Sequence, residues 1–508
     1  MQLFVERTHA TQPGWIPTER ETTEIAEICR RLDGLQLAIE LAASRLRVLD
    51  TASLLDRLGG RLDVLGSAPD LPDRQRTLNA TLEWSHDLLG EEERMLFRRL
   101  AIFVGGWTPA AAEAVCGDGL PDVLGGLERL AEHSLVSSYR GAAGQRMRML
   151  ETIRQYAAAR LDESGEAEDV HRRHAAYFER FVHELRCLFD GKRAVEAMCI
   201  LDEDWQNIES VVVPWRVAAG DYTTLVLLAS TTWRYVWLYD RVREATTWMA
   251  DAYDAREQLE PPLRGELCRI WSSALYQLGD YGRAKDILEE AVELLAEWGP
   301  RDREAWARAI LAGLLPHFEP DHTRAQQEAS RAVEIFRAER NDFGLATALG
   351  IAGTLTILRG DTEEGTRQLD EGLAASERVG LPSLIGANRA LRAFASLSTG
   401  DVAEARRYLE EAARTPLYLE GTAFCLEGLA AVALAEGDPV RAATALGAAE
   451  GLRERTGIEM WPVVRTAFAP TIDALDAAGP EVHAARYEGR HMNPRDTFAQ
   501  LARAAAVV

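Results

Sequence analysis

The sequence is poor in lysine: only Lys192 and Lys285 occur among its 57 basic residues, and all the others are arginine. A phosphate-binding loop of the GxxxxGK[ST] type needs glycines for close backbone approach, a lysine for the β- and γ-phosphates and a hydroxyl for Mg²⁺. Lys192 follows Gly191, but Arg186 stands where the first glycine belongs and Arg193 where the hydroxyl belongs. Lys285 has no adjacent glycine. We therefore predict that this chain alone does not hydrolyse ATP.

Cysteine pairing signals are also missing. None of the six cysteines forms a CxxC pair, and most lie in apolar helical patterns. This usage predicts reduced core thiols in a cytoplasmic protein. The apolar stretch LVLLASTTWRYVWLYD is too short to span a bilayer and contains Arg234. No basic-then-apolar leader follows Met1, so we expect no export.

Positive charge is scarce as well, since 57 basic residues face 80 acidic ones and the net charge is −23. Residues 1–165 hold 19 basic and 25 acidic side chains, and the remainder holds 38 and 55. An acidic surface repels nucleic acid and anionic lipid. The motifs GxSxG and HExxH and any paired-cysteine metal signature are absent too. We therefore expect a protein that is not an enzyme, binds no metal or membrane, and contacts DNA only through a local basic patch.

What the sequence does contain is a dense series of helix signals from Glu19 onward. Residues 21–32 carry apolar side chains at helical period, and Asp33 with Gly34 supplies a stop. A second helix is predicted over residues 37–48, and Asp50 is placed to cap a third. With 508 residues, further domains are expected downstream.

Five stretches carry a resemblance to a known family: LFVERTHA (3–10), GLQLAIELAASRL (34–46), TLEWSHDLLGEEERMLFRRLAIFVGGW (81–107), RMLETIRQYAAARL (148–161) and LDEDWQNI (201–208). They resemble the NB-ARC-type signalling ATPases of bacterial transcriptional regulators, the STAND class, of the kind associated with LuxR and SARP regulators. The resemblance runs over nearly the whole chain. It implies a P-loop domain, a helical subdomain, a winged helix and helical repeats in that order, with ATP or ADP as the cofactor of the intact family. The chain then corresponds to the portion after the P-loop domain.

In this family a Gly-Leu-Pro-Leu motif of the helical part lies against the adenine. The resemblance therefore implies a vestigial adenine-side contact from Leu35, Gln36 and Leu37, with Gln36 in the place of the family's proline. The alternative for Gln36 is an exposed residue at the start of a helix. Three explanations of the missing P-loop stay open: a natural truncation, a start upstream of Met1, or a P-loop supplied by another chain. We expect no cofactor for this chain alone.

Residues 76–165 fit a winged helix. Helices are predicted over 77–89, from Glu91, from Thr108-Pro109 and over 121–133, and Glu151 begins a closing helix. The segments SLVSSY and QRMRML read as strands around a turn at 141–144.

Winged helices often bind DNA through the helix that precedes the hairpin. Here that helix, PDVLGGLERLAEH, offers Arg129 among acidic neighbours, which suits a DNA reader poorly. The candidates for DNA contact are Arg140, Arg146 and Arg148 on the hairpin, and the alternative for them is a solvated hairpin edge. The family resemblance likewise implies that the winged helix is an internal part of the switch.

The C-terminal half contains a period. Turn pairs occur at 279–280, 320–321, 360–361, 400–401 and 437–438, spaced by 41, 40, 40 and 37 residues. Small residues follow five and twelve positions after each turn, and Leu or Ala follows nine positions after it. Glycine ends one helix, aspartate caps the next, and small residues let paired helices approach closely. The pattern predicts stacked helical hairpins that look like tetratricopeptide repeats, whose usual period is about 34 residues.

A stacked solenoid presents a concave surface for a protein or a small effector. The candidates for effector binding are Trp233, Trp237, Tyr239 and Trp248, and the alternative for them is an aromatic core stripe. His171 and His174 share a helix face, but two histidines without a third ligand rarely hold zinc.

The sequence thus predicts a mainly α fold with five parts. They are a helical subdomain (1–75), a winged helix with a short β-hairpin (76–165), degenerate repeats (166–270), a TPR-like α-solenoid (271–478) and a C-terminal capping helix (479–508). We predict that the chain is the regulatory and sensor portion of a STAND-type transcriptional regulator. In this portion the binding of an effector to the solenoid is relayed to the winged helix. The alternatives are a DNA-binding regulator that uses 77–161, an ATPase completed by a partner's P-loop and a decayed fragment with no role.

Overall fold

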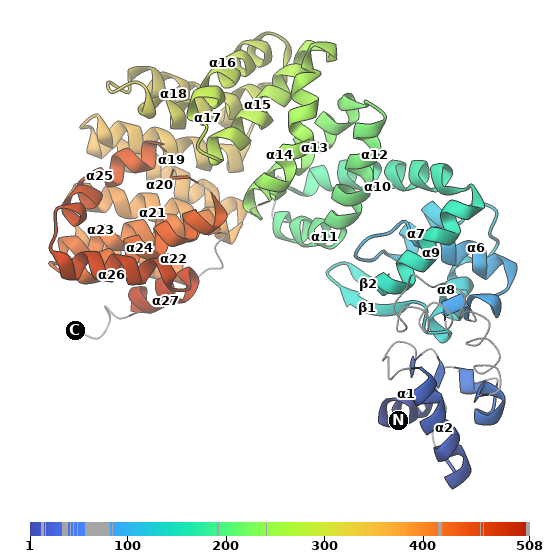
Figure 1. Cartoon of the computed structure of the whole chain (residues 1–508). Helices are drawn as coiled ribbons and strands as arrows, with labels where there is room; N and C mark the ends of the chain where they lie inside the picture. Colours follow the sequence, from blue (N-terminus) through green and yellow to red (C-terminus); the bar gives the residue numbers. More distant parts are fainter. Residues whose placement is uncertain are drawn as a thin grey trace. The chain divides into compact units, whose positions relative to one another are not determined.

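The computed structural model describes residues 1–11, 15, 17–32, 39–40, 42–43, 45–47, 49–55, 82–83, 85–189, 193–239, 241–414, 419–457, 459–460 and 462–503. Within these ranges the chain is mainly α-helical with a single two-stranded sheet, which confirms the predicted fold class (Figure 1). None of the helices in these ranges has the length and apolar character that a bilayer crossing requires.

The chain divides into two compact units. The first comprises Met1–Phe181 and Cys199–Trp215, and the second comprises Val182–Met198 and Arg216–Val508. The chain passes from one unit to the other inside α10 (Ala167–Phe189), inside α11 (Ala194–Asn207) and inside α12 (Val213–Ala218), which follows the π-helical turn η2 (Ile208–Val212). The finer division into five parts stays a prediction.

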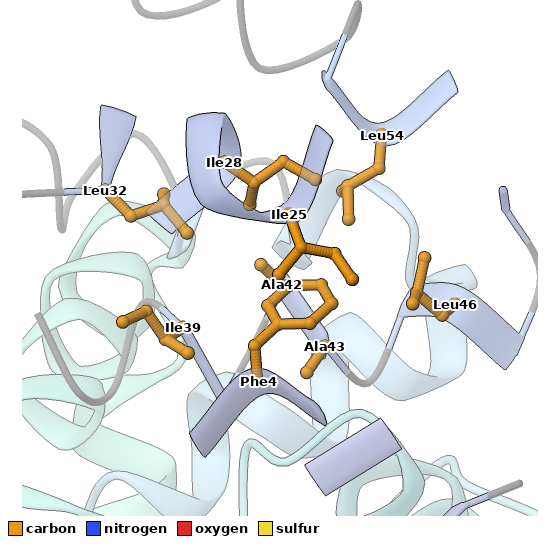
Figure 2. Close-up of a cluster of buried hydrophobic side chains, with 9 residues drawn as sticks. All are labelled: Phe4, Ile25, Ile28, Leu32, Ile39, Ala42, Ala43, Leu46 and Leu54. Carbon is orange, nitrogen blue, oxygen red and sulfur yellow. The ribbon is translucent and has the colours of Figure 1, made fainter. Parts of the chain in front are cut away.

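The first unit begins with a helical subdomain that contains α1 (Gln2–Thr11), α2 (Glu19–Arg31) and the 3-10 turn η1 (Arg45–Arg47). A capping box starts α2, because Glu21 N–H donates to Thr18 Oγ1 and Thr18 N–H donates to Glu21 Oε2 at 2.7 Å. Figure 2 shows the core that these segments enclose: Phe4, Ile25, Ile28, Leu32, Ile39, Ala42, Ala43, Leu46 and Leu54. Phe4 and Ile25 are fully buried, so the amphipathic face of α2 packs inward.

Two predicted features of this subdomain have different outcomes. Asp50 caps the helical residues 51–55 as predicted, since its Oδ1 accepts from Ser53 N–H at 2.7 Å. The predicted stop at Asp33 and Gly34 lies outside the described residues.

The winged helix follows in the same unit. It contains α6 (Glu91–Leu100), α7 (Pro109–Cys116), α8 (Val123–Glu132), β1 (Ser137–Gly141), β2 (Gly144–Arg148) and α9 (Glu151–Ser164). Thr108 caps α7 by accepting from Ala111 N–H at 3.1 Å. The strands run further into the turn than predicted, because Gly141 pairs with Gly144 and leaves a two-residue loop. Of the helix predicted over 77–89, the described residues 82–83 and 85–87 are helical.

The second unit is a stack of antiparallel helical hairpins that continues from α13 to α24. Its elements are α13 (Tyr222–Leu238), α14 (Val242–Asp254), η3 (Arg256–Gln258), α15 (Pro261–Gln277), α16 (Tyr281–Trp298), α17 (Arg301–Leu314), η4 (Leu315–His317), α18 (Thr323–Ala338), α19 (Asp342–Leu358), α20 (Thr362–Val379), α21 (Pro382–Ser398), α22 (Val402–Ala413), α23 (Leu419–Ala435) and α24 (Pro439–Thr456). Each helix packs against its hairpin partner and against the next hairpin, which is the contact pattern of a TPR-like solenoid.

The predicted repeat register is confirmed by burial. All fifteen positions that lie five, nine and twelve residues after the turns are buried: Ala284, Leu288, Ala291, Ala325, Ala329, Ala332, Gly365, Leu369, Gly372, Ala405, Leu409, Ala412, Ala442, Leu446 and Ala449. Gly365 shows why small residues are needed, since an added Cβ would lie 2.7 Å from the carbonyl oxygen of Gly353 on the partner helix. Four of the five turn aspartates cap the following helix, namely Asp280, Asp361, Asp401 and Asp438.

The turn at Pro320-Asp321 is the exception, and there the predicted aspartate cap is wrong. Gly279 takes a φ of +82°, but a proline ring fixes φ near −65° and prevents this at position 320. The left-handed residue is instead His322, with a φ of +54°, and it is the residue that precedes α18. Asp321 still accepts from Thr323 N–H at 3.1 Å, so the helix start keeps an acceptor.

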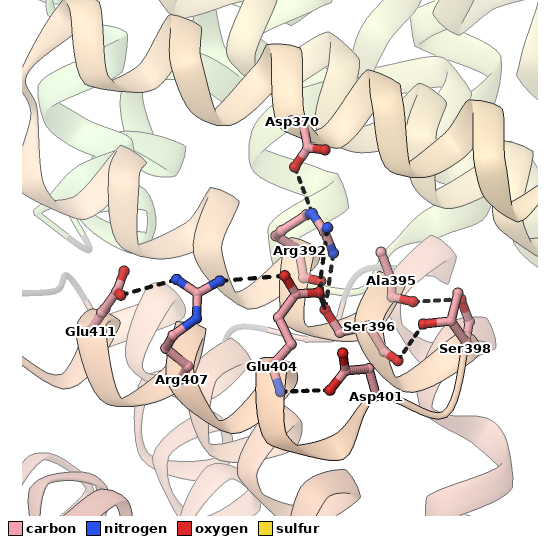
Figure 3. A network of polar contacts seen from close by, with 10 residues as sticks. Asp370, Arg392, Ala395, Ser396, Ser398, Asp401, Glu404, Arg407 and Glu411 are labelled. Atoms are coloured by element: carbon pink, nitrogen blue, oxygen red, sulfur yellow. Dashed lines mark hydrogen bonds and ion pairs between the residues drawn. The ribbon is translucent and has the colours of Figure 1, made fainter.

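A polar network joins three successive helices of the solenoid (Figure 3). Arg392 on α21 donates to Asp370 on α20 at 2.6 Å and to Ser396 Oγ at 2.9 Å. Ser396 in turn donates to Glu404 on α22 at 2.8 Å, and Arg407 pairs with the same carboxylate. Arg392 is largely buried, so these contacts satisfy a charge inside the stack.

The end of the chain differs from the single capping helix that the sequence predicts. In the described residues 462–503, α25 (Pro462–Asp476) precedes the predicted capping segment 479–508, and two helices, α26 (Pro480–His491) and α27 (Pro494–Arg503), lie within it. Helix α26 packs on α24, and α27 packs on α22, α23 and α24, so this part does cap the stack. Helix α25 instead contacts η4, α17, α19 and α23, which places it across the first helices of several hairpins.

Candidate functional site

A buried ion pair joins the β-hairpin of the winged helix to the end of α11. Arg146 on β2 donates to both carboxylate oxygens of Asp204, at 2.6 and 2.9 Å. The two side chains are 3% and 6% exposed. Burial alone would lower the pKa of Arg146, but the hydrogen bonds and the charge of Asp204 outweigh it and raise that pKa. Arg146 also donates to Tyr139 Oη at 3.1 Å, so its guanidinium is held from several sides.

The amide of Asn207 holds the loop that precedes α7. Its Oδ1 accepts from Val104 N–H at 2.8 Å, and its Nδ2 donates to the carbonyl oxygen of Gly106 at 2.9 Å. Gly106 has a φ of +133°, and an added Cβ would lie 2.8 Å from the carbonyl oxygen of Met147. This position therefore requires glycine. We call Asp204, Asn207 and Arg146 the wing clasp.

The wing clasp changes the interpretation of the DNA-contact candidates. The prediction for Arg146 is wrong in this structure: it is 2% exposed and bonded to Asp204, so it presents no charge to a phosphate. Arg146 is buried against Glu203 and Asp204, whereas the neighbouring Met147 pairs with Trp107 through two backbone hydrogen bonds. Arg148 is exposed and lies 5.5 Å from the centre of the Tyr139 ring, and Arg140 is exposed as well.

The helix that would enter a DNA groove is α8, and its basic side chain is engaged. Arg129 pairs with Glu93 of α6 at 2.6 Å and lies 3.7 Å from Asp122. At the end of α8, His133 Nδ1 lies 2.5 Å from Arg45 Nη1 of the helical subdomain. Burial lowers the pKa of Arg45 to about 10, which still leaves it charged at neutral pH. The adenine-side candidates Leu35, Gln36 and Leu37 lie outside the described residues.

The two histidines of α10 occupy different surroundings. His174 is fully buried against Phe103 and Phe178, with ring centres 5.2 and 4.6 Å away. His171 stacks on Trp215 at 5.1 Å. Among the described residues no group of three or more His, Cys, Asp or Glu side chains is arranged to hold a metal ion.

The burial of His174 predicts a pH-dependent first unit. Burial lowers its pKa to about 3, so below its unfolded pKa of about 6.5 the unfolded chain binds a proton that the folded chain does not. Stability is therefore fully present above pH ~6.5 and is lost as the pH falls, by about 1.4 kcal/mol per pH unit. Hydrogen exchange of α6–α9, corrected for intrinsic rates, should show a loss of roughly 2 kcal/mol between pH 7 and 5.

The variant H174Q should lose most of this slope, and H171Q should keep it. A smaller dependence remains in H174Q, because burial also lowers the pKa of His86. An unchanged slope in H174Q would show that His174 is not the titrating group.

The second unit contains a cavity. Its empty volume is about 1000 Å³, which includes the part of its opening that is filled by solvent. Its walls come from α13, α15, α17, α19 and the end of α10. Of the four predicted effector-binding aromatics, Trp233 and Trp237 line this cavity. Tyr239 is exposed and stacks on Tyr235 with ring centres 4.6 Å apart, and Trp248 is buried in α14. Two of the four predicted effector-binding residues therefore line the cavity, and the other two do not.

The polar lining of this cavity was not evident from the sequence. Arg269 donates twice to Glu266, both times at 2.7 Å, and both residues are buried. Burial alone would raise the pKa of Glu266, but the charges of Arg269 and Arg303 outweigh it and hold that pKa at about 2. Glu266 is therefore ionised at neutral pH. Arg234 lies 3.8 Å from the centre of the Phe343 ring and donates to the carbonyl oxygen of Phe189.

Comparisons with known proteins agree with the winged helix. Residues 89–162 match the profile of the winged helix-turn-helix domain family. Two relatives whose names describe HTH-type transcriptional regulators, from Mycobacterium bovis and Mycobacterium tuberculosis, are each 36% identical over 253 residues, which is 49% of this chain and 28% of theirs. An uncharacterised Mycobacterium bovis protein is 37% identical over 187 residues, 35% of this chain and 47% of that protein. This chain therefore spans less than half of the length of these relatives.

Among solved structures, a STAND protein with a tetratricopeptide repeat sensor from Pyrococcus horikoshii is similar at 14% identity and a TM-score of 0.44, over 90% of this chain and 72% of that one. A Rap protein complexed with competence and sporulation factor is similar at 14% identity and a TM-score of 0.36, over 61% and 77%.

Proposed function

We propose that the chain is the regulatory and sensor portion of a STAND-type bacterial transcriptional regulator. A protein or small effector binds the TPR-like solenoid, and its binding is relayed to the winged helix, which acts as an internal switch. The observation that carries this proposal is the wing clasp: the hairpin of the winged helix is covered by the chain's own residues 203–207, with Arg146 sequestered by Asp204. In the intact regulator the switch is coupled to ADP/ATP exchange on a P-loop domain.

Helices α10 and α11 are the parts of the chain through which the relay would pass. Helix α10 carries His174 in the core of the first unit and Phe189 at the wall of the cavity. Helix α11 starts in the second unit and ends in the wing clasp. An effector shifts such an equilibrium only by its differential affinity for two states, so the cavity must differ between the clasped and the released wing.

The relay is testable without knowledge of the effector. We expect T347F, which places a larger side chain in the cavity wall, to change the hydrogen exchange of residues 137–148 and 199–207 in the full chain. A side chain that fits the two states of the cavity unequally shifts the equilibrium between them, and the coupled site reports that shift. The control is R337Q, which removes an arginine that pairs with Glu371 outside the cavity. Identical wing exchange in T347F, R337Q and the unmodified chain would overturn the relay.

A second candidate function is favoured by one observation, the match of residues 89–162 to the winged helix-turn-helix domain family. On this alternative the winged helix binds DNA through the exposed Arg140 and Arg148. Fluorescence anisotropy with a labelled DNA duplex at low salt distinguishes a DNA-binding winged helix from an internal switch. Binding that weakens steeply with salt and is lost in R140A/R148A would replace the internal switch by a DNA reader. No binding at low salt is the result we expect.

A further inference from the structure

The chain's own C-terminal part binds beside the cavity of the second unit. Glu459 N–H donates to the carbonyl oxygen of Gln277, and Tyr281 Oη donates to the carbonyl oxygen of Met460 at 2.9 Å. Helix α25 then packs against α17, α19 and α23. These contacts fill part of the surface that an open solenoid would offer to a partner chain. The remaining space suits a small molecule better than an extended peptide or a protein surface.

A second cavity of about 510 Å³ adjoins the first, because both are lined by Trp237, Thr347 and Ile351. Apart from these shared residues its walls are mostly apolar and include Leu384, Leu391, Phe424, Val463 and Val464. Taken together, the two adjoining cavities have one polar, aromatic lobe and one apolar lobe.

The charge of the polar lobe is opposite to that of the whole chain. Its lining includes four arginines, Arg186, Arg234, Arg269 and Arg303, and one carboxylate, Asp302. Glu266 pairs with Arg269 at 2.7 Å and lies 3.7 Å from Arg303, and Asp302 lies 3.6 Å from Arg303, so two carboxylates face the four guanidinium groups. In a chain of net charge −23 this local excess of guanidinium groups selects an anion, and arginine is suited to carboxylates.

The apolar lobe contains one buried acceptor that lacks a donor. Asn388 is 3% exposed, and its Nδ2 donates to the carbonyl oxygen of Leu384 at 2.9 Å. This bond fixes the orientation of the amide, and Asn388 Oδ1 has no hydrogen-bond partner in the part of the chain that the structure describes. A buried carbonyl oxygen without a donor costs free energy, so a ligand with an N–H or O–H group at this point would be favoured.

We propose that this joined cavity binds a small planar aromatic carboxylate that carries an N–H or O–H donor. The carboxylate lies at the arginines of the polar lobe, the ring lies along Trp237, and the donor faces Asn388 Oδ1. The inference rests on the proposed sensor function and names the chemical class of the effector.

Isothermal titration of the full chain with three probes tests this inference. Indole-3-acetate has both the carboxylate and the N–H, 1-naphthaleneacetate lacks the N–H, and tryptamine carries an ammonium in place of the carboxylate. We expect indole-3-acetate to bind most tightly and tryptamine to bind at least about tenfold more weakly. R303Q should weaken indole-3-acetate binding by about tenfold, R337Q should leave it unchanged, and N388A should abolish the preference for the indole over the naphthalene. A thermal melt of each variant verifies the fold.

The outcomes separate this inference from the proposed function. Tryptamine binding as tight as that of indole-3-acetate, or equal effects of R303Q and R337Q, would overturn the assignment of an anionic ligand while the sensor role stands. A folded chain that binds none of the three probes would overturn the small aromatic acid. Selective binding of indole-3-acetate without a change in the hydrogen exchange of residues 137–148 and 199–207 would support the proposed ligand class. The same result would overturn the proposed relay to the winged helix.

Discussion

Replacing Arg146 by alanine is expected to lower the stability of the first unit by about 3–5 kcal/mol, because it leaves the carboxylate of Asp204 buried without its partner. Asp204 is 4% exposed, so water cannot replace the lost guanidinium at small cost. Denaturant titration followed by hydrogen exchange of α6–α9 measures the change. The exchange of residues 137–148 should rise most, since the covering contact over the hairpin is removed.

The matched control is R148A, two residues along the same strand. Arg148 is exposed, and its alanine variant should stay within about 0.5 kcal/mol of the unmodified chain. The double variant R146M/D204L removes both charges and should recover much of the stability lost in R146A, since no unpaired charge stays buried. If R146A and R148A cost the same, the wing clasp does not hold the hairpin.

The repeat architecture was predictable because its signals are local. A glycine with positive φ at Gly400 and a carboxylate acceptor at Asp401 act within one turn of chain, and the structure places both as expected. The small residues are equally readable, because close helix packing at Gly365 tolerates no larger side chain. The helix starts of the winged helix at Thr108 and Glu151 follow the same logic.

The wing clasp was not predictable, because it joins residues that are 58 positions apart. The sequence marks LDEDWQNI as a shared stretch but does not tell which residue contacts the hairpin. Its place on the hairpin left two possibilities for Arg146, a phosphate contact or a solvated edge, and the carboxylate of Asp204 buries it instead. Tertiary context, not local pattern, decides such a residue.

The cavity was predicted in part. Trp233 and Trp237 were singled out as aromatics four residues apart on α13, and they do face the cavity. The charged wall from Arg269 and Arg303 comes from two other hairpins, and α25 returns over the stack from the C-terminal part. No periodic signal encodes these long-range placements.

The close contact between α24 and α26 depends on two glycines of α24. At Gly447 and Gly451 an added Cβ would overlap the backbone carbonyl oxygens of Arg486 and Arg490. Because the opposing atoms are backbone, the whole of α26 must shift to relieve the overlap. Overpacking of this kind costs about 1–3 kcal/mol per site, so G451A should destabilise the cap and G447A/G451A should do so more strongly.

The same substitution should have the opposite sign at Gly282, which lies in α16 with open space around the position of a Cβ. There alanine lowers the entropy of the unfolded chain and favours the helix by up to about 1 kcal/mol. Glu450 pairs with both Arg486 and Arg490, so the ion pairs of α26 should loosen together with its backbone in G451A. Hydrogen exchange of residues 480–491, compared between G451A and G282A, measures the difference. Equal protection of α26 in the two variants would show that the close helix contact is not what holds the cap to the solenoid.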